Sequence, residues 1–145
     1  MTKEDKELLL KDLCARLSYG VIVGYSTKDN PNTLDKIARV IYVDIRFGMI
    51  QMQVESGISY GLSPSEFIKP YLRPMSSMTE EENEEFEELF ISYSISQDRN
   101  CVYHASRGDL NLEIIDWLNA HHFDYRGLID KGLALEAQEG MYNKQ

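Results

Sequence analysis

Two of the three histidines in this 145-residue chain are adjacent, and they lie close to its only tryptophan. The stretch at 117–129 contains both, His121 and His122, followed by Asp124. Imidazole nitrogens and a carboxylate form the ligand set of many transition-metal sites. A further nitrogen could come from His104, upstream in the sequence. These four residues are therefore the candidate metal ligands of a small metal-dependent hydrolase or nuclease.

The spacing of these residues favours a different interpretation. Neighbouring residues of a helix point about 100° apart, so His121 and His122 cannot both face one ion if a helix continues through them. The chain also lacks the HxxxH and HExxH spacings. In the alternative, the histidines end one helix and Asp124 caps the next, with Phe123 and Leu128 as a hydrophobic staple. We prefer this interpretation, which requires no metal and no cofactor.

Other catalytic chemistry has little support in the sequence. Cys14 and Cys101 are the only cysteines, and both lie in apolar, periodic segments. This position predicts two reduced, buried thiols rather than nucleophiles. The chain has no GxSxG, Walker-type or GxGxxG motif. We assign no catalytic residue and expect a protein that is not an enzyme.

The charge of the chain restricts its partners. The net charge is −9, and the basic residues are scattered. Nucleic-acid binders usually carry a basic stripe, so we expect no autonomous binding to DNA or RNA. Seven of the acids are glutamates between Glu80 and Glu88. Such a run is typical of the solvated face of a helix, but it could also dock a basic protein or mimic DNA in an acidic inhibitor.

Three helices are predicted. Apolar residues at three-and-four spacing indicate a helix over 4–17 and another over 110–122. Thr79 and Glu82 form a capping box that begins a helix over 80–95. Ser63–Glu66 has the same capping-box pattern, which predicts a fourth, short helix.

Strand signals fill most of the first half of the chain. The β-branched run within 19–25 predicts a strand. Two alternating runs around Gly48 predict a hairpin whose apolar residues face one core; these residues are Ile41, Val43, Ile45, Phe47, Ile50, Met52 and Val54. Residues 58–62 and 101–105 are predicted to add two further strands. Residues 26–32 have the composition of an exposed loop.

These elements predict an α+β fold in one domain spanning residues 1–145. We expect a small antiparallel meander of four or five strands, open or curled toward a barrel, packed with three to four helices. Residues 136–145 lack periodicity and are predicted to form a frayed tail. No segment has the roughly 20 apolar residues of a membrane span, and the charged N-terminus does not resemble a signal peptide. We therefore expect a cytoplasmic protein with no membrane association.

A non-enzymatic protein–protein interaction module is the function that these observations favour. The candidate surfaces are the acidic helix and residues 71–73 of the extended connector Pro70–Pro74, which we expect to be exposed. The candidate contact residues are Tyr71, Arg73, Glu81, Glu84, Glu88, Tyr125 and Arg126. The sequence identifies neither the protein partner nor whether the chain forms a homo-oligomer.

Three blocks of the chain also carry a resemblance. They are LLLKDLCARL at 8–17, KPYLRPMSSMTEEE at 69–82 and WLNAHHFDYRGLI at 117–129. In these blocks the chain resembles a set of short uncharacterised proteins of Bacteroides-type gut bacteria, of prophage or mobile-element origin. The resemblance implies a bacterial accessory role, and it brings no activity, cofactor or catalytic residue with it.

Overall fold

The computed structural model describes residues 1–26, 34, 36–54, 57–97 and 103–142, apart from the side chains of 57–64, 90–97 and 103–111. The loop expected at 26–32 therefore lies outside the described residues beyond Ser26. The elements in chain order are α1 (Lys3–Arg16), β1 (Ile22–Tyr25), β2 (Lys36–Asp44), β3 (Met49–Val54), β4 (Gly57–Pro64), β5 (Ile68–Leu72), α2 (Glu80–Gln97), α3 (Tyr103–Ala120) and β6 (Leu135–Glu136). Short 3₁₀ turns, η1 (Leu17–Tyr19), η2 (Ser65–Phe67) and η3 (Met75–Ser77), connect some of them.

The predicted α+β class is confirmed. The strands form one open sheet in the order β4-β3-β2-β1-β5-β6. The pairs from β4 to β5 are antiparallel, and β6 adds a short parallel edge to β5. The meander β1 to β4 follows chain order, whereas β5 returns to the other side of β1. A chain segment after the meander therefore becomes an interior strand of the sheet.

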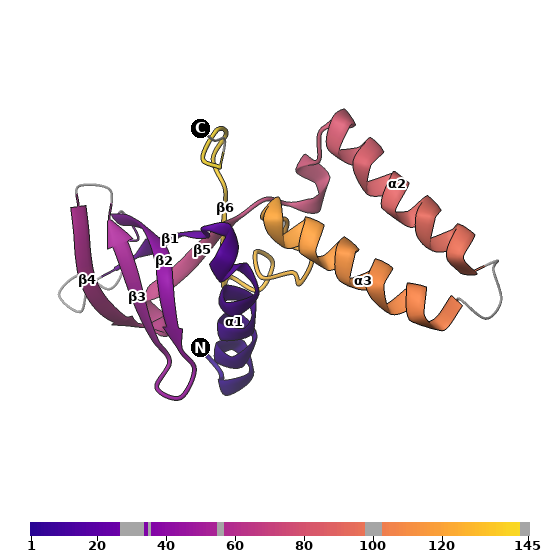
Figure 1. The fold of residues 1–145 in the computed structure, drawn as a ribbon. Helices are drawn as coiled ribbons and strands as arrows, with labels where there is room; N and C mark the ends of the chain where they lie inside the picture. The colour runs from indigo at the N-terminus through magenta and orange to yellow at the C-terminus, as the bar shows by residue number, and fades with distance from the viewer. Residues whose placement is uncertain (27–33, 35, 55–56, 98–102, 143–145) are drawn as a thin grey trace.

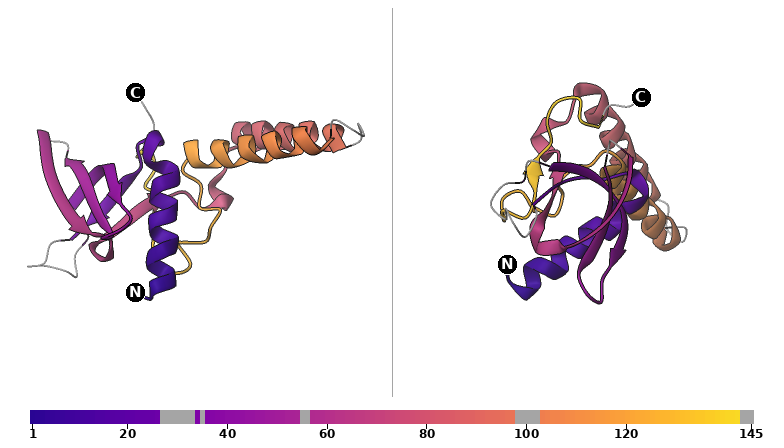
Figure 2. Two further views of the ribbon diagram at one scale, coloured as in Figure 1. Left: turned by 60° about the horizontal axis from the view of Figure 1, so that its bottom comes forward. Right: turned by 90° about the vertical axis from the view of Figure 1, so that its left-hand side faces the viewer.

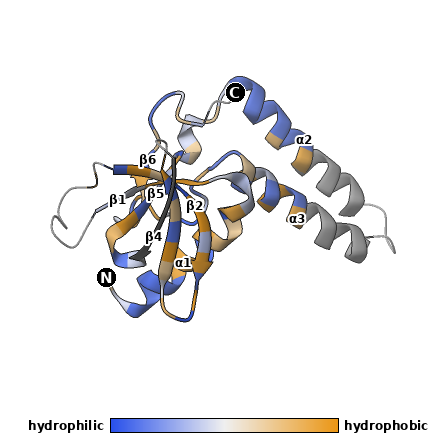
Figure 3. Ribbon diagram, turned by 60° about the vertical axis from the view of Figure 1, so that its left-hand side comes forward, coloured by the Kyte–Doolittle hydropathy of each residue, from blue (hydrophilic) through white to orange (hydrophobic). Residues whose placement is uncertain are grey.

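Helix α1 covers one face of the sheet (Figure 1). It begins with a capping box between Thr2 and Asp5, and it buries one stripe of leucines. Hydrophobic residues concentrate where α1 meets the sheet, while the first turns of α2 are hydrophilic (Figure 3). The core residues include Leu9, Leu13, Val21, Val23, Val40, Ile50, Ile68, Leu72 and Leu128. The predicted helix at 4–17 and the predicted β3 core residues Ile50 and Met52 are thus confirmed.

Helices α2 and α3 pack side by side as a hairpin that extends away from the sheet (Figures 1 and 2). We call this hairpin the α2–α3 arm. Helix α2 begins with the predicted capping box, in which the Glu82 backbone N–H donates to Thr79 Oγ1 at 3.2 Å and the Thr79 N–H donates to Glu82 Oε1 at 3.0 Å. Among the described residues, no helix is long and apolar enough to cross a membrane.

The predicted apolar face of β2 is only partly correct. Ala38 and Val40 face the core, whereas Ile41, Ile45 and Phe47 are 40%, 67% and 69% exposed. The pairing of β2 with β3 is irregular between Val40 and Tyr42, where one extra residue enters β2. Such a bulge changes which residues of a strand face the core. Of the four predicted residues, Val43 pairs with Ile50 and packs against the core, whereas Ile41 lies at the bulge and Ile45 and Phe47 lie in the turn after β2.

The segment around Pro70 also differs from expectation. Ser63–Glu66 begins no α-helix, because Pro64 ends β4 and Ser65 begins the turn η2. The connector at 70–74 is extended, but it is not exposed, since its first three residues belong to β5 between β1 and β6. Tyr71 is only 8% exposed. Pairing with a strand that lies 45 residues earlier buries this segment, as shown by the register of Val23 with Pro70 and Tyr25 with Ile68.

Two C-terminal expectations are also wrong. The strand expected at 101–105 is helical from Tyr103, where α3 begins, and Cys101 lies outside the described residues. The tail expected to fray after Glu136 instead makes specific contacts as far as Tyr142, whose hydroxyl donates to the Tyr71 carbonyl oxygen at 2.6 Å. Cys14, expected to be buried, is exposed.

Alanine substitution of adjacent residues in β2 tests the bulge. Val40→Ala should lower the free energy of unfolding by about 2 kcal/mol, because it leaves a cavity in the core. Ile41→Ala should change it by less than about 0.5 kcal/mol, because Ile41 is on the solvent side. Urea unfolding measures both values. The opposite ranking would show that the alternation read from the sequence is correct and that the bulge is not present.

Candidate functional site

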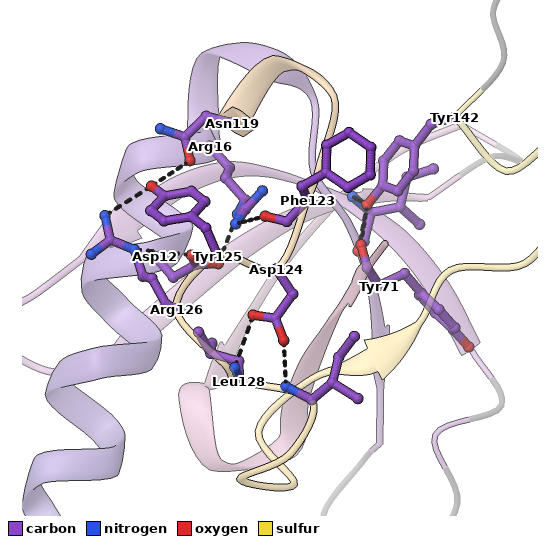
Figure 4. Close-up of polar contacts among 12 residues, drawn as sticks. Asp12, Arg16, Tyr71, Asn119, Phe123, Asp124, Tyr125, Arg126, Leu128 and Tyr142 are labelled. Carbon is purple, nitrogen blue, oxygen red and sulfur yellow. Dashed lines mark hydrogen bonds and ion pairs between the residues drawn. The ribbon is translucent and has the colours of Figure 1, made fainter. Parts of the chain in front are cut away.

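A buried guanidinium joins α1 to the segment that follows α3 (Figure 4). Arg16 has no exposed surface, and its Nε donates to Asp12 Oδ2 at 2.9 Å. Its Nη2 donates to the Phe123 carbonyl oxygen at 2.6 Å. The guanidinium carbon also lies 5.3 Å from the centre of the Tyr125 ring. Arg16 therefore links α1 to Phe123, which lies 107 positions later in the sequence.

The candidate contact residues Tyr125 and Arg126 take part in the same junction. Arg126 Nε lies 3.2 Å from Asp12 Oδ1, so the buried carboxylate has a cation near each of its oxygens. Tyr125 donates its hydroxyl to Asn119 Oδ1 at 2.8 Å and accepts from Arg126 Nη2 at 3.1 Å. Both side chains are half-buried. Their contacts hold the molecule together and leave only part of each residue for a partner.

His122 ends α3 in the left-handed conformation, with φ of 61°. Its N–H donates to the Asn119 carbonyl oxygen at 3.1 Å, and the Phe123 N–H donates to that of Leu118 at 3.0 Å. This pair of bonds is the Schellman motif, which satisfies the last carbonyl groups of a helix. The expectation that the two histidines close a helix is confirmed by this geometry.

The His121 ring faces back along α3. Its Nδ1 lies 2.8 Å from the Trp117 carbonyl oxygen. A carbonyl only accepts, so Nδ1 carries the proton and Nε2 of the neutral ring is an acceptor. The ring also stacks on Trp117, with 4.1 Å between centroids.

The His122 ring points to a different neighbour. It is 5% exposed and stacks on Tyr142, with 3.6 Å between ring centroids. Burial, followed by the positive charges of Arg16 and Arg39, lowers the pKa of His122 from 6.5 to about 3. The imidazole is therefore neutral over the physiological range, and its Nδ1 has no hydrogen-bond partner among the described residues.

The Asp124 carboxylate is bound by backbone amides. Its two oxygens accept from the N–H groups of Leu128 and Ile129 at 2.8 and 2.9 Å (Figure 4). The expectation that amide hydrogens occupy this carboxylate is confirmed, but residues 124–132 form turns rather than the expected helix. These hydrogen bonds come from residues four and five positions after Asp124, whereas an N-cap side chain accepts from residues two or three positions after it. Phe123 and Leu128 are nevertheless both fully buried.

The structure directs three of the four candidate metal ligands toward different neighbours. His121, His122 and Asp124 are directed at Trp117, at Tyr142 and at backbone amides, respectively. The side chain of His104 lies outside the described part of the structure. Among the residues that are described, no group of three His, Cys, Asp or Glu side chains could hold a metal ion.

Tyr142 inserts its hydroxyl where β1 and β5 separate. The two strands pair from Tyr25 to Val23, and the next residues, Ile22 and Tyr71, are bridged by the tyrosine instead. The hydroxyl accepts from the Ile22 N–H at 3.0 Å and donates to the Tyr71 carbonyl oxygen at 2.6 Å. Burial raises the pKa of Tyr142 to about 12, so the hydroxyl keeps its proton.

Arg73 fixes the base of the α2–α3 arm to the sheet. It follows β5, and its Nη1 and Nη2 each donate to a different Glu82 oxygen at 2.6 Å. The hydrogen bond from Arg73 lowers the pKa of Glu82 to about 2, although burial opposes the shift. Its backbone N–H donates to the His122 carbonyl oxygen at 2.8 Å, and its guanidinium carbon lies 4.3 Å from the centre of the Phe123 ring. Arg73, a candidate contact residue, is thus largely engaged within the protein.

The glutamates of α2 divide into two groups. Glu82 binds Arg73, and Glu85 Oε2 accepts from Trp117 Nε1 at 3.1 Å, which ties α2 to α3. The remaining five are exposed: Glu80, Glu81, Glu84, Glu87 and Glu88. At about 100° per residue, these five fall within an arc of about 120° around the helix. They form one acidic face, which we call the α2 glutamate face.

A hollow of about 730 Å³ lies where α2 begins, α3 ends and the C-terminal segment 136–142 passes. We call it the basal hollow. Its lining includes four glutamates and both adjacent histidines, namely Glu81, Glu82, Glu136, Glu139, His121 and His122. Arg73 and Tyr142 also line it. The sequence identified the histidines but did not indicate that they line one hollow with Glu136 and Glu139.

Three residues of this region were missed in the sequence. Asp12 and Arg16 are four residues apart, and both are buried with Leu9 and Leu13 on the core side of α1. A charged pair at helical spacing within an apolar stripe is a signal that could have identified them. Tyr142 has no comparable signal, because it is an isolated aromatic residue in a segment without periodicity.

Comparison with known proteins identifies no relative: no family model matches the chain, and neither does any curated protein or solved structure.

Removing the buried cation tests the junction. Arg16→Met should lower the free energy of unfolding by about 3–5 kcal/mol, because Asp12 and the Phe123 carbonyl oxygen stay buried without their donor. The double variant Asp12→Leu/Arg16→Met should be less destabilised than the sum of the two single changes. Urea denaturation gives these values, and Lys11→Met, an exposed change on the same helix, is the control. Equal losses for Arg16→Met and Lys11→Met would contradict the role given to Arg16.

The His122 pKa predicts a pH dependence of stability. The unfolded chain takes up a proton near pH 6.5 and the folded chain only near 3, so stability is present above pH 6.5 and is lost as the pH falls toward 3. Between about pH 6 and 5 this residue should contribute a slope of up to about 1.4 kcal/mol per pH unit. Chemical denaturation at several pH values measures it. His122→Asn, which tolerates positive φ, should reduce the slope; an unchanged slope would show that His122 titrates normally.

Proposed function

We propose that this protein is a non-enzymatic interaction module that binds a basic protein partner through the α2 glutamate face. One observation carries the proposal: five exposed glutamates share one side of a helix that extends away from the sheet (Figure 1). All five side chains are exposed, so a partner can reach them from the solvent. The accessory role implied by the resemblance to mobile-element proteins is compatible with this function.

The attachment of α2 supports the proposal. Glu82 and Glu85, the glutamates outside the face, bind Arg73 and Trp117 and so set the rotation of the helix. Phe86 and Trp117 contribute a ring contact at 5.3 Å between the two helices of the arm. A charged face with a fixed orientation loses less conformational entropy on binding than one on a mobile segment. Opposite charges across an interface also raise the rate of association.

Three of the four residues that suggested a metal-dependent enzyme make structural contacts. Asp124 closes a loop, His121 binds the end of α3, and His122 stacks on Tyr142. A general base or metal ligand needs a directed lone pair and a second reactive group near it. The contacts of these three side chains therefore lend no support to a catalytic function.

Charge reversal tests the proposed surface. The triple variant Glu81→Lys, Glu84→Lys and Glu88→Lys should lose the captured partner, because like charges then oppose it across the interface. Partners are captured on immobilised protein from extracts of a Bacteroides-type bacterium, identified by mass spectrometry, and retested as purified proteins. The partner should be basic, and 0.5 M salt should weaken its binding at least tenfold.

A matched control separates position from net charge. Glu4→Lys, Glu66→Lys and Asp130→Lys change the net charge by the same amount at exposed positions away from α2. This control should keep the partner, and both triple variants should melt within a few degrees of the parent protein. Equal loss of binding in both variants, or a partner that is retained by the α2 variant, would refute the proposed surface.

A further inference from the structure

We propose that a groove on the sheet, on the face opposite α1, binds the C-terminal residue of a partner chain. The groove has a volume of about 460 Å³ and lies between β2 and the segment 138–141. We call it the β2 groove. None of the residues that line it belongs to α2, so this inference goes beyond the proposed function.

Neighbouring strands place three side chains of the groove in one row. Arg39 of β2 lies opposite Ile22 of β1 and opposite Gln53 of β3. Residues directly opposite each other in a sheet point to the same face. The core residues Val23 and Val40 alternate with this row along their strands and pack with α1. The row of three therefore points away from α1.

Arg39 is the positive group of the β2 groove. Its Nη1 donates to the Gly20 carbonyl oxygen at 2.7 Å. Gly20 has φ of 70°, and a Cβ at this position would overlap Arg39 Nη1, so the absence of a side chain makes room for the guanidinium. Among the described residues, no carboxylate forms an ion pair with Arg39, and its Nη2 and Nε donate no hydrogen bond. These two groups can bind a carboxylate together.

One acidic residue limits the charge of the ligand. Glu139 also lines the groove, on the segment that passes beside β2, and it is exposed. It forms no ion pair with Arg39 in the described part of the chain. Its charge repels an anion, but salt screens exposed charges that are not in contact. The groove therefore favours a single negative charge directed at Arg39 over a polyanion.

Aliphatic side chains line the groove next to this cation. Ile37 lies two positions before Arg39, on the same face of β2, and is 48% exposed. Ile22 and Met141 line the same groove, and a methionine side chain adapts readily to the shape of an apolar ligand. A ligand with an aliphatic side chain beside its carboxylate would remove Ile37 from water.

Two carboxamides favour a peptide over a fatty acid. Gln53 and Gln138 both line the groove and are exposed, and their side chains make no hydrogen bond with another described residue. Each offers one acceptor oxygen and two N–H donors, which complement the N–H and carbonyl of a peptide group. A fatty acid brings only its carboxylate. We therefore assign the groove to a chain terminus with an aliphatic last residue.

The wall of the groove is fixed in position. The Met141 N–H donates to the Gln138 carbonyl oxygen at 3.1 Å. The next residue, Tyr142, accepts from the Ile22 N–H and donates to the Tyr71 carbonyl oxygen (Figure 4). A wall that is already ordered loses less conformational entropy when a ligand binds.

Peptide binding tests the assignment. The probe is the acetylated peptide Gly-Ser-Gly-Leu with a free C-terminal carboxylate, and its control is the same peptide with a C-terminal amide. Backbone amide NMR shifts locate the binding. The acid should give saturable shifts at Ile22, Arg39, Gln53 and residues 138–141. The amide should bind about tenfold more weakly, because it loses the charge-assisted contact with Arg39.

Charge variants locate the carboxylate. Arg39→Gln should weaken the free-acid peptide about tenfold. Arg46→Gln removes the same charge from the exposed turn after β2, outside the groove, and should leave affinity within about twofold. Glu139→Gln should strengthen binding, because it removes a repelling charge. Thermal melting checks that the variants fold. Equal binding of the amide, absence of saturable shifts, or equal effects of Arg39→Gln and Arg46→Gln would overturn the proposal.

A variant of the apolar lining gives a second readout that leaves Arg39 in place. Ile37→Thr keeps a β-branched residue in the strand and should weaken the leucine peptide about threefold, because less apolar surface is buried. A peptide that ends in serine should bind the parent protein and this variant equally. A leucine peptide that binds the parent no better than the serine peptide would contradict the apolar part of the site.

Octanoate provides the final comparison. Octanoate that binds as tightly as the leucine peptide would assign the groove to a free fatty acid and overturn the assignment to a chain terminus. The inference and the proposed function can fail separately. If the groove binds the peptide while α2 charge reversal leaves partner capture intact, only the proposed function fails; the reverse pattern removes only the inference.

Discussion

The buried guanidinium of Arg16 is the interaction on which the arrangement of the helices depends. Taking a charge out of water is costly unless its hydrogen-bonding groups find partners in the protein. Arg16 finds Asp12 on its own helix and the Phe123 carbonyl oxygen beyond α3, and it lies near the Tyr125 ring. These directional contacts fix where α3 ends relative to α1. The base of the α2–α3 arm and the basal hollow are positioned as a result.

Local patterns in the sequence predicted those elements that local interactions determine. The capping box of Thr79 and Glu82 is made within one turn, and it begins α2 as expected. The buried residues of β3 alternate without interruption. The bulge near Val40 and the burial of Tyr71 depend on pairing with other strands, which a local pattern does not contain. Long-range pairing is the physical reason for both errors.

The candidate site shows the same division. Its sequence indicated that Asp124 would accept backbone hydrogens and that the histidines would end a helix, because these are contacts between near neighbours. It could not indicate that Glu136 and Glu139 line the same hollow as His121, or that Arg73 binds Glu82 from the end of a buried strand. The fold brings these groups to one hollow from three separate parts of the chain. The excess of carboxylates in this hollow therefore appears only in the folded structure.

Tyr142 has a consequence for the order of folding. Its hydroxyl completes the hydrogen bonding of Ile22, 120 residues earlier, at the point where β1 and β5 separate. During synthesis, the Ile22 N–H therefore lacks this protein partner until almost the whole described chain has been made. Contacts across so long a separation in sequence form slowly. The nascent chain would expose an incomplete sheet throughout that interval. Chaperones that cover exposed apolar surface and strand edges would be most useful during it.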